Sequence, residues 1–90
     1  MSRKLLKIVL HKKAEKELEN LNLDVKGRIM EAFKEMKEDP FAGDVKPVKG
    51  LKGVFRRRVG DYRIIFTVSF EENTVVILRI SPREKAYESI

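Results

Sequence analysis

Residues 54–66, VFRRRVGDYRIIF, place arginines at a spacing that could bind an anion. Two runs with the composition of β-strands flank Gly60 and Asp61, and Gly followed by Asp is among the pairs that close a two-residue hairpin. This turn predicts that Arg58 pairs directly with Arg63. Because side chains alternate between the two faces of a strand, Arg56 is expected on the same face as those two arginines.

The opposite face of this hairpin is apolar and is expected to be core; it carries Phe55, Val59, Tyr62, Ile64 and Phe66. Two arginines placed directly opposite each other repel, at a cost within the roughly 0.2 to 1 kcal/mol that cross-strand pairs are worth. A chain that needed only to fold has little reason to keep them there. The arginines form either a solvated basic face or a site for an anion such as phosphate, which a guanidinium binds through paired hydrogen bonds.

Length and charge indicate one small basic domain spanning residues 1–90. The net charge is +6, and residues 44–63 contain seven Lys or Arg against two Asp. Lys46, Lys49 and Lys52 recur every third residue in the segment 41–53, which its Pro and Gly residues predict to be a loop or a short irregular crossover. These lysines are either solvated or an outer RNA-binding rim. The basic region predicts salt-dependent attraction to nucleic acid or an acidic protein.

Several classes of site are excluded or not indicated by composition. The chain has no cysteine, which excludes disulfides, zinc-thiolate sites and thiol nucleophiles. No cofactor and no metal are indicated. Charges at Arg3, Lys4 and Lys7 interrupt the first apolar run, so no membrane span is expected there and a cytoplasmic location is predicted.

Apolar periodicity predicts an α+β fold in which two antiparallel N-terminal helices pack on one face of a small, mostly antiparallel, four-stranded sheet. The strands are expected at residues 4–10, 54–59, 62–70 and 75–81. His11 is expected to be an exposed connector at the start of a helix over 11–21. A second helix is expected from Asp24, taken as its N-cap, to Glu38. The expected core-facing helix residues are Ala14, Leu18, Leu21, Val25, Ile29, Ala32, Phe33 and Met36.

A register for the last strand follows from burying its apolar residues. A three-residue loop after Phe70 would turn Val76, Leu78 and Ile80 to the core beside Phe66, Val68 and Phe70, and would place Arg79, Ser81 and Arg83 opposite Thr67, Ile65 and Arg63. Arg79 and Arg83 would then join the three hairpin arginines. Tyr87 follows Arg83 by four residues. Its phenol either ties the tail to the domain or lies beside the arginines, whose positive potential would lower its pKa.

Three segments carry a resemblance to a known family: LKG at 51–53, RRRVGDYRIIF at 56–66 and ILRISPREKAY at 77–87. With the order of elements, they resemble the RelE branch of the RelE/ParE toxin superfamily over essentially the whole chain. The resemblance implies an mRNA interferase that cuts messenger RNA in the ribosomal A site. It also implies a RelB-type antitoxin as partner and allows a toxin-antitoxin heterotetramer. The functional residues it implies are Arg56, Arg58, Arg63, Arg83 and Tyr87.

One departure from that family concerns the base. The best-known RelE members have lysines at the two strand positions, where this chain has Arg56 and Arg58. Arginine keeps its proton at neutral pH and is a poor base, although it still binds phosphate. The implied reaction is a metal-free transesterification by the 2′-hydroxyl of the RNA. Two alternatives stay open: a ParE-type, non-enzymatic inhibitor of DNA gyrase, and a catalytically weakened binding module with the same fold.

Overall fold

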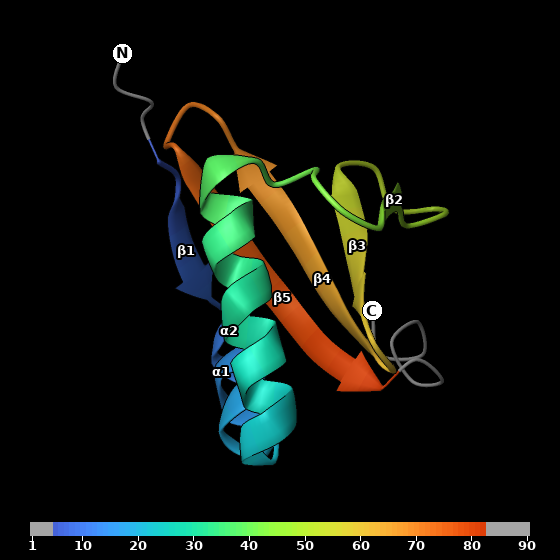
Figure 1. The fold of residues 1–90 in the computed structure, drawn as a ribbon. Helices are drawn as coiled ribbons and strands as arrows, with labels where there is room; N and C mark the ends of the chain where they lie inside the picture. Colours follow the sequence, from blue (N-terminus) through green and yellow to red (C-terminus); the bar gives the residue numbers. More distant parts are fainter. Residues whose placement is uncertain (1–4, 83–90) are drawn as a thin grey trace.

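The computed structural model describes residues 5–82 and contains two helices and five strands (Figure 1). The predicted site residues Arg83 and Tyr87 therefore lie outside the described residues. In chain order the elements are β1 (Lys7–Leu10), α1 (Lys12–Glu19), α2 (Leu23–Glu38), β2 (Val45–Pro47), β3 (Val54–Val59), β4 (Tyr62–Ser69) and β5 (Thr74–Pro82). Neither helix in this part of the chain is long and apolar enough to cross a membrane.

The strands form one sheet in the order β1-β5-β4-β3-β2, in which β1 runs parallel to β5 and the other pairs are antiparallel. The prediction of four strands was wrong because β2, in the segment read as a loop, pairs with β3. This strand has three residues and ends at Pro47, whose ring nitrogen has no hydrogen to donate. Such a strand is tolerated at a sheet edge. Because it is short and contains a proline, it has no recognisable strand pattern in the sequence.

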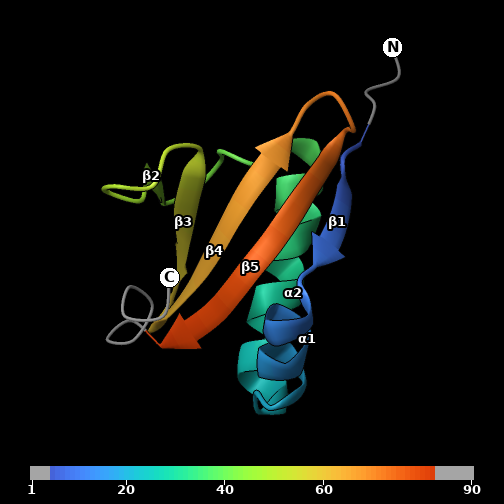
Figure 2. The same ribbon diagram turned by 180° about the vertical axis from the view of Figure 1, so that it is seen from behind.

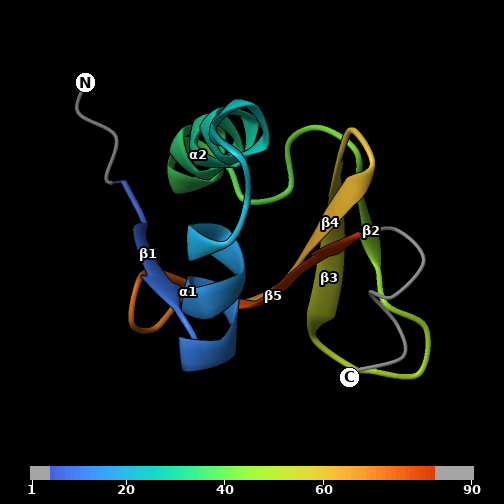
Figure 3. The same ribbon diagram turned by 90° about the horizontal axis from the view of Figure 1, so that it is seen from below.

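The two helices contribute their apolar faces to one core, as predicted. Figure 3 shows α2 on one side of the sheet, whereas α1 follows β1 and lies against β5. His11 is exposed, as expected, and it caps α1 because its Nδ1 accepts a hydrogen bond from the Lys13 N–H at 3.3 Å. The N-cap of α2 is Asn22 rather than Asp24, since Asn22 Oδ1 accepts from the Val25 N–H at 2.9 Å. Of the residues of α2 expected to face the core, Ile29, Ala32, Phe33 and Met36 are buried and Val25 is half-buried.

The hairpin formed by β3 and β4 has the predicted register. Arg58 pairs with Arg63 and Val59 pairs with Tyr62, so Gly60 and Asp61 form the two-residue turn. Gly60 has φ 59°, a value that glycine adopts without steric cost and that a two-residue hairpin turn requires.

The predicted register between β4 and β5 was wrong because the pairing contains a β-bulge. Ile65 pairs with Arg79 and Phe66 with Ile77, so Leu78 is an extra residue between the two pairs. The bulge interrupts the alternation of faces on which the prediction relied. Leu78 consequently packs with Ile65 in a small second cluster, while the main core takes Val75, Ile77 and Ile80. Phe70, predicted to be core, is 68% exposed.

The middle arginine of the run is buried on the core face. Arg57 pairs with Ile64, is 8% exposed, and forms an ion pair with Glu35 of α2. Its Nη1 also donates to the carbonyl oxygen of Ala42 at 3.3 Å. A buried charge is tolerated when it is paired and hydrogen-bonded. Arg57 therefore joins α2, the following loop and β3, and it is not part of the basic face.

Two glycines allow a matched test of this packing. Gly43 has φ 82°, and a Cβ there would lie 3.0 Å from Arg57 Cζ, whereas a Cβ on Gly27 within α2 would meet no atom within 4 Å. We expect Gly43→Ala to lower the free energy of unfolding by about 1 to 2 kcal/mol. Gly27→Ala should raise it by roughly 0.5 to 1 kcal/mol, because alanine restricts the unfolded chain. Urea unfolding of both variants measures the difference, and equal shifts of the same sign would contradict this account.

Candidate nucleic-acid interface

A basic face lies on the side of the sheet that faces away from α2; Figure 2 shows this side, with α2 behind the strands. Cross-strand pairing places Lys46 beside Arg56, which in turn pairs with Ile65. In the next row, Arg58 pairs with Arg63. We call Lys46, Arg56, Arg58 and Arg63 the basic face. Three of these are the predicted hairpin arginines, so the prediction that those arginines share one face is confirmed.

The three arginines differ in their access to solvent. Arg58 is exposed, and its Nε donates a hydrogen bond to the Gly60 carbonyl oxygen at 3.3 Å, which holds the guanidinium near the hairpin turn. Arg56 is half-buried, and Arg63 is only 9% exposed. The arrangement offers one exposed guanidinium with two less exposed ones on the same face. Guanidinium groups so placed can bind a phosphate through several charge-assisted hydrogen bonds.

The loop between β2 and β3 holds the two remaining lysines of the predicted rim. Lys49 and Lys52 are exposed. The loop is closed by backbone hydrogen bonds, from the Val48 N–H to the Val54 carbonyl oxygen at 2.8 Å and from the Val54 N–H to the Leu51 carbonyl oxygen at 3.2 Å. The lysines therefore extend from an anchored loop, next to the strand that carries Lys46.

Arg79, predicted to bind RNA, is held by a carboxylate of α1. Its Nη2 lies 2.7 Å and its Nε 3.1 Å from Glu17 Oε2. The same carboxylate accepts hydrogen bonds from the Ile80 N–H at 2.8 Å and from the Ser81 hydroxyl at 3.2 Å. Burial alone would raise the pKa of Glu17, but the hydrogen bonds from Arg79, Ile80 and Ser81 and the positive charge of Arg79 together hold that pKa below its ordinary value.

The contact between Glu17 and Arg79 was missed by the sequence analysis. The two residues are 62 positions apart, and Glu17 lies among other lysines and glutamates of α1. No spacing rule distinguishes it from those neighbours. Arg57 did carry a usable signal, because the hairpin register that was predicted places it on the core face, where an arginine needs an acidic partner.

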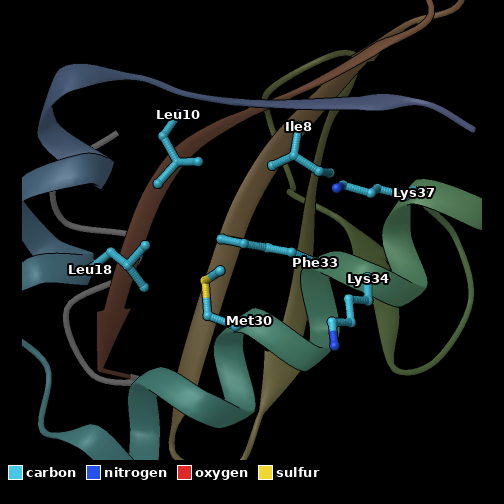
Figure 4. Close-up of a pocket in the computed structure, with 7 residues that line it drawn as sticks. All are labelled: Ile8, Leu10, Leu18, Met30, Phe33, Lys34 and Lys37. Carbon is cyan, nitrogen blue, oxygen red and sulfur yellow. The ribbon is translucent and has the colours of Figure 1, made fainter.

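A second surface feature lies between β1, α1 and α2 and is mainly apolar. It is a groove of about 330 Å³, and Figure 4 shows Met30 and Phe33 of α2 facing β1 across it. Lys34 and Lys37 stand at its edge. The apolar lining is formed by Ile8, Leu10, Leu18, Met30 and Phe33. Exposed apolar surface edged by cations is suited to a protein partner rather than to RNA.

The chain is similar in sequence and in fold to known toxins of toxin-antitoxin systems. Residues 8–87 match the sequence model of a family described as the ParE toxin of the type II toxin-antitoxin system parDE. A protein of Methanocaldococcus jannaschii named RelE1 is 29% identical over 85 residues, a match covering 91% of this chain and 94% of that protein. A chain of the archaeal RelE-RelB complex of Pyrococcus horikoshii has a TM-score of 0.78 at 28% identity, with 91% of this chain and 99% of that chain covered. A chain of the toxin-antitoxin complex RelBE2 of Mycobacterium tuberculosis also has a TM-score of 0.78 at 28% identity, and the match covers 91% of this chain and 95% of that chain.

Proposed function

This chain belongs to the ParE toxin family of type II toxin-antitoxin systems, and we propose that it is a RelE-type endoribonuclease that cleaves messenger RNA in the ribosomal A site. The observation that carries the proposal is the direct pairing of Arg58 with Arg63 on the open face of the sheet, beside Arg56 and Lys46. The names of the relatives support it, since RelE1 and the RelE-RelB and RelBE2 complexes are all of RelE type.

The proposed reaction is an attack by the 2′-hydroxyl of the messenger on the adjacent phosphodiester. The new bond gives a 2′,3′-cyclic phosphate, the 5′-oxygen leaves, and one proton passes from the 2′-hydroxyl to solvent or a base while another reaches the leaving oxygen. Charge accumulates on the phosphate, where each well-placed donor is worth about 3 to 4 kcal/mol. Arg63, together with Arg56 or Arg58, binds that phosphate. Low exposure suits Arg63 to this role, because its position is held before RNA arrives.

The proton transfers need groups other than the arginines of β3, because a guanidinium group is a poor base. We assign Tyr87 to orient or deprotonate the 2′-hydroxyl and Arg83 to stabilise the leaving oxygen. Lys46, Lys49 and Lys52 attract the flanking phosphates without precise placement, and this attraction falls as salt rises. The ribosome supplies whatever positioning of the messenger these residues do not.

Two assays separate this proposal from the ParE-type alternative, which the name of the matching family favours. The purified chain is added to a translating extract, and messenger cleavage is mapped by primer extension. In parallel, supercoiling by DNA gyrase is measured with and without the chain. Cleavage within the A-site codon with unaffected gyrase supports the proposal. Gyrase inhibition without cleavage would assign the ParE-type function, and ribosome binding with neither effect would assign a binding module.

The partner we propose is a RelB-type antitoxin that places an amphipathic segment in the groove between β1, α1 and α2. Relatives of this chain were solved as RelE-RelB and RelBE2 complexes. The groove offers apolar side chains, including exposed Met30, and the cations Lys34 and Lys37 at its edge. An antitoxin segment with apolar residues at helical spacing and acidic flanks is complementary to both features.

A charge placed in the groove should weaken antitoxin binding. We expect Met30→Glu to raise the antitoxin Kd by at least about tenfold, since moving a carboxylate from water into an apolar contact costs more than the roughly 1.4 kcal/mol this represents. Isothermal titration with the cognate antitoxin measures the change. Leu23→Glu is the matched control, because Leu23 is exposed at the start of the same helix and does not line the groove. Equal weakening by both variants, or by neither, would place the antitoxin elsewhere.

A further inference from the structure

We propose that Glu17 masks Arg79, so that Arg79 is withheld from RNA and phosphate binding is confined to the hairpin side of the sheet. The inference rests on the proposed function, because it specifies which cations of the RNA-binding surface are available. Glu17 is a positioning residue in this account: it acts on RNA only through Arg79.

Arg79 would extend the basic face if it had no acidic neighbour. Arg79 of β5 pairs with Ile65 of β4, and Ile65 pairs in turn with Arg56 of β3. Arg56 pairs with Lys46 of β2, so the four residues form one row across four strands. Figure 2 shows β5, β4 and β3 side by side on the face away from α2. A guanidinium at the β5 end of this row lies on a path that an RNA strand crossing the sheet could follow.

Glu17 holds Arg79 through several hydrogen bonds in a partly buried position. Arg79 donates through Nε to both oxygens of the Glu17 carboxylate and through Nη2 to Oε2. The Ile80 N–H donates to Oε1 at 2.8 Å. Arg79 also donates to the Ser81 hydroxyl oxygen at 3.1 Å. The side chains of Arg79 and Glu17 are 12% and 23% exposed, so salt screens this pair less than a surface pair. The ion pair between Arg28 and Asp24, by contrast, is mostly exposed.

Masking has a consequence for where RNA binds. Each phosphate contact to a single strand contributes about 0.7 to the slope of log K against log salt concentration. With Arg79 engaged, the exposed guanidinium on this face of the sheet, among the described residues, is that of Arg58, beside the less exposed Arg56 and Arg63. A phosphate is then drawn toward the hairpin arginines rather than toward the β5 side of the sheet.

The test is the binding of a 2′-O-methyl oligouridylate, which lacks the attacking hydroxyl, measured by fluorescence anisotropy over a range of KCl concentrations. Arg79→Gln should leave the affinity close to that of the unaltered chain, whereas Arg58→Gln should weaken it by about fivefold at 0.1 M salt. Glu17→Gln should tighten binding by about fivefold and steepen the slope by about 0.7. The double variant Glu17→Gln with Arg79→Gln should return to the unaltered affinity.

Glu35→Gln is the matched control. It removes the same formal charge, but its partner Arg57 is buried on the opposite face, so the slope should not change. Binding of each variant to heparin, measured as the salt concentration at elution, reports accessible positive charge without any role in RNA cleavage. Glu17→Gln should elute at higher salt than Glu35→Gln.

The outcomes separate the two proposals. A loss of affinity in Arg79→Gln equal to that in Arg58→Gln would overturn the masking, as would identical behaviour of Glu17→Gln and Glu35→Gln on both RNA and heparin. If Arg58→Gln leaves RNA binding unchanged, the proposed RNA face fails, and the heparin comparison still decides the masking. If Glu17→Gln does not fold by circular dichroism, Arg79→Gln carries the decision alone.

Discussion

Arg63→Ala is expected to lower the rate of messenger cleavage by about 10²- to 10³-fold, the loss seen when one preorganised donor to a developing oxyanion is removed. Arg63 is held beside Arg58 on the open face and is nearly buried, so it is the best-placed of the described arginines for this role. Growth arrest on expression and primer extension in a translating extract measure the effect. Arg83→Ala should behave in the same way, because the resemblance assigns Arg83 to the same site.

Arg28→Ala is the matched control for these variants, because Arg28 is an exposed arginine of α2 that pairs with Asp24. It should retain full cleavage. Circular dichroism and urea unfolding establish that Arg63→Ala is folded at the assay temperature. Full toxicity in both Arg63→Ala and Arg83→Ala would remove the proposed site.

Phe66→Ala is expected to lower the free energy of unfolding by about 3 to 5 kcal/mol, the usual cost of truncating a buried phenylalanine. Phe66 is completely buried at the centre of β4, with its ring centroid 5.9 Å from that of Phe55 and 6.4 Å from that of Phe41. A domain of this size has only about 5 to 15 kcal/mol of total stability. The variant should therefore unfold at a much lower urea concentration or be largely unfolded at 37 °C.

Phe70→Ala is the control on the same polypeptide segment. Phe70 is exposed, and its ring centroid lies 6.3 Å from that of Phe41. Its removal should cost less than about 1 kcal/mol, because little apolar surface returns to water. Similar unfolding midpoints for the two variants would mean that the core is not centred on Phe66.

The sequence alone determined the elements whose partners are close along the chain. The register of β3 and β4 follows from a two-residue turn and a period of two, so the pairing of Arg58 with Arg63 was predicted correctly. The apolar faces of α1 and α2 were predicted for a similar reason, since the helical repeat is a local property. These are the features that assemble the hairpin part of the basic face.

The tertiary structure decided what depends on distant partners. The strand β2 forms because it pairs with the edge of β3. The bulge at Leu78 lets Ile80 pack in the main core while Leu78 packs against apolar residues on the opposite face of the sheet. The environment of Arg79 is set by Glu17, 62 residues away. Local propensity does not record such contacts, because each residue alone suits several environments and only the packed fold selects one.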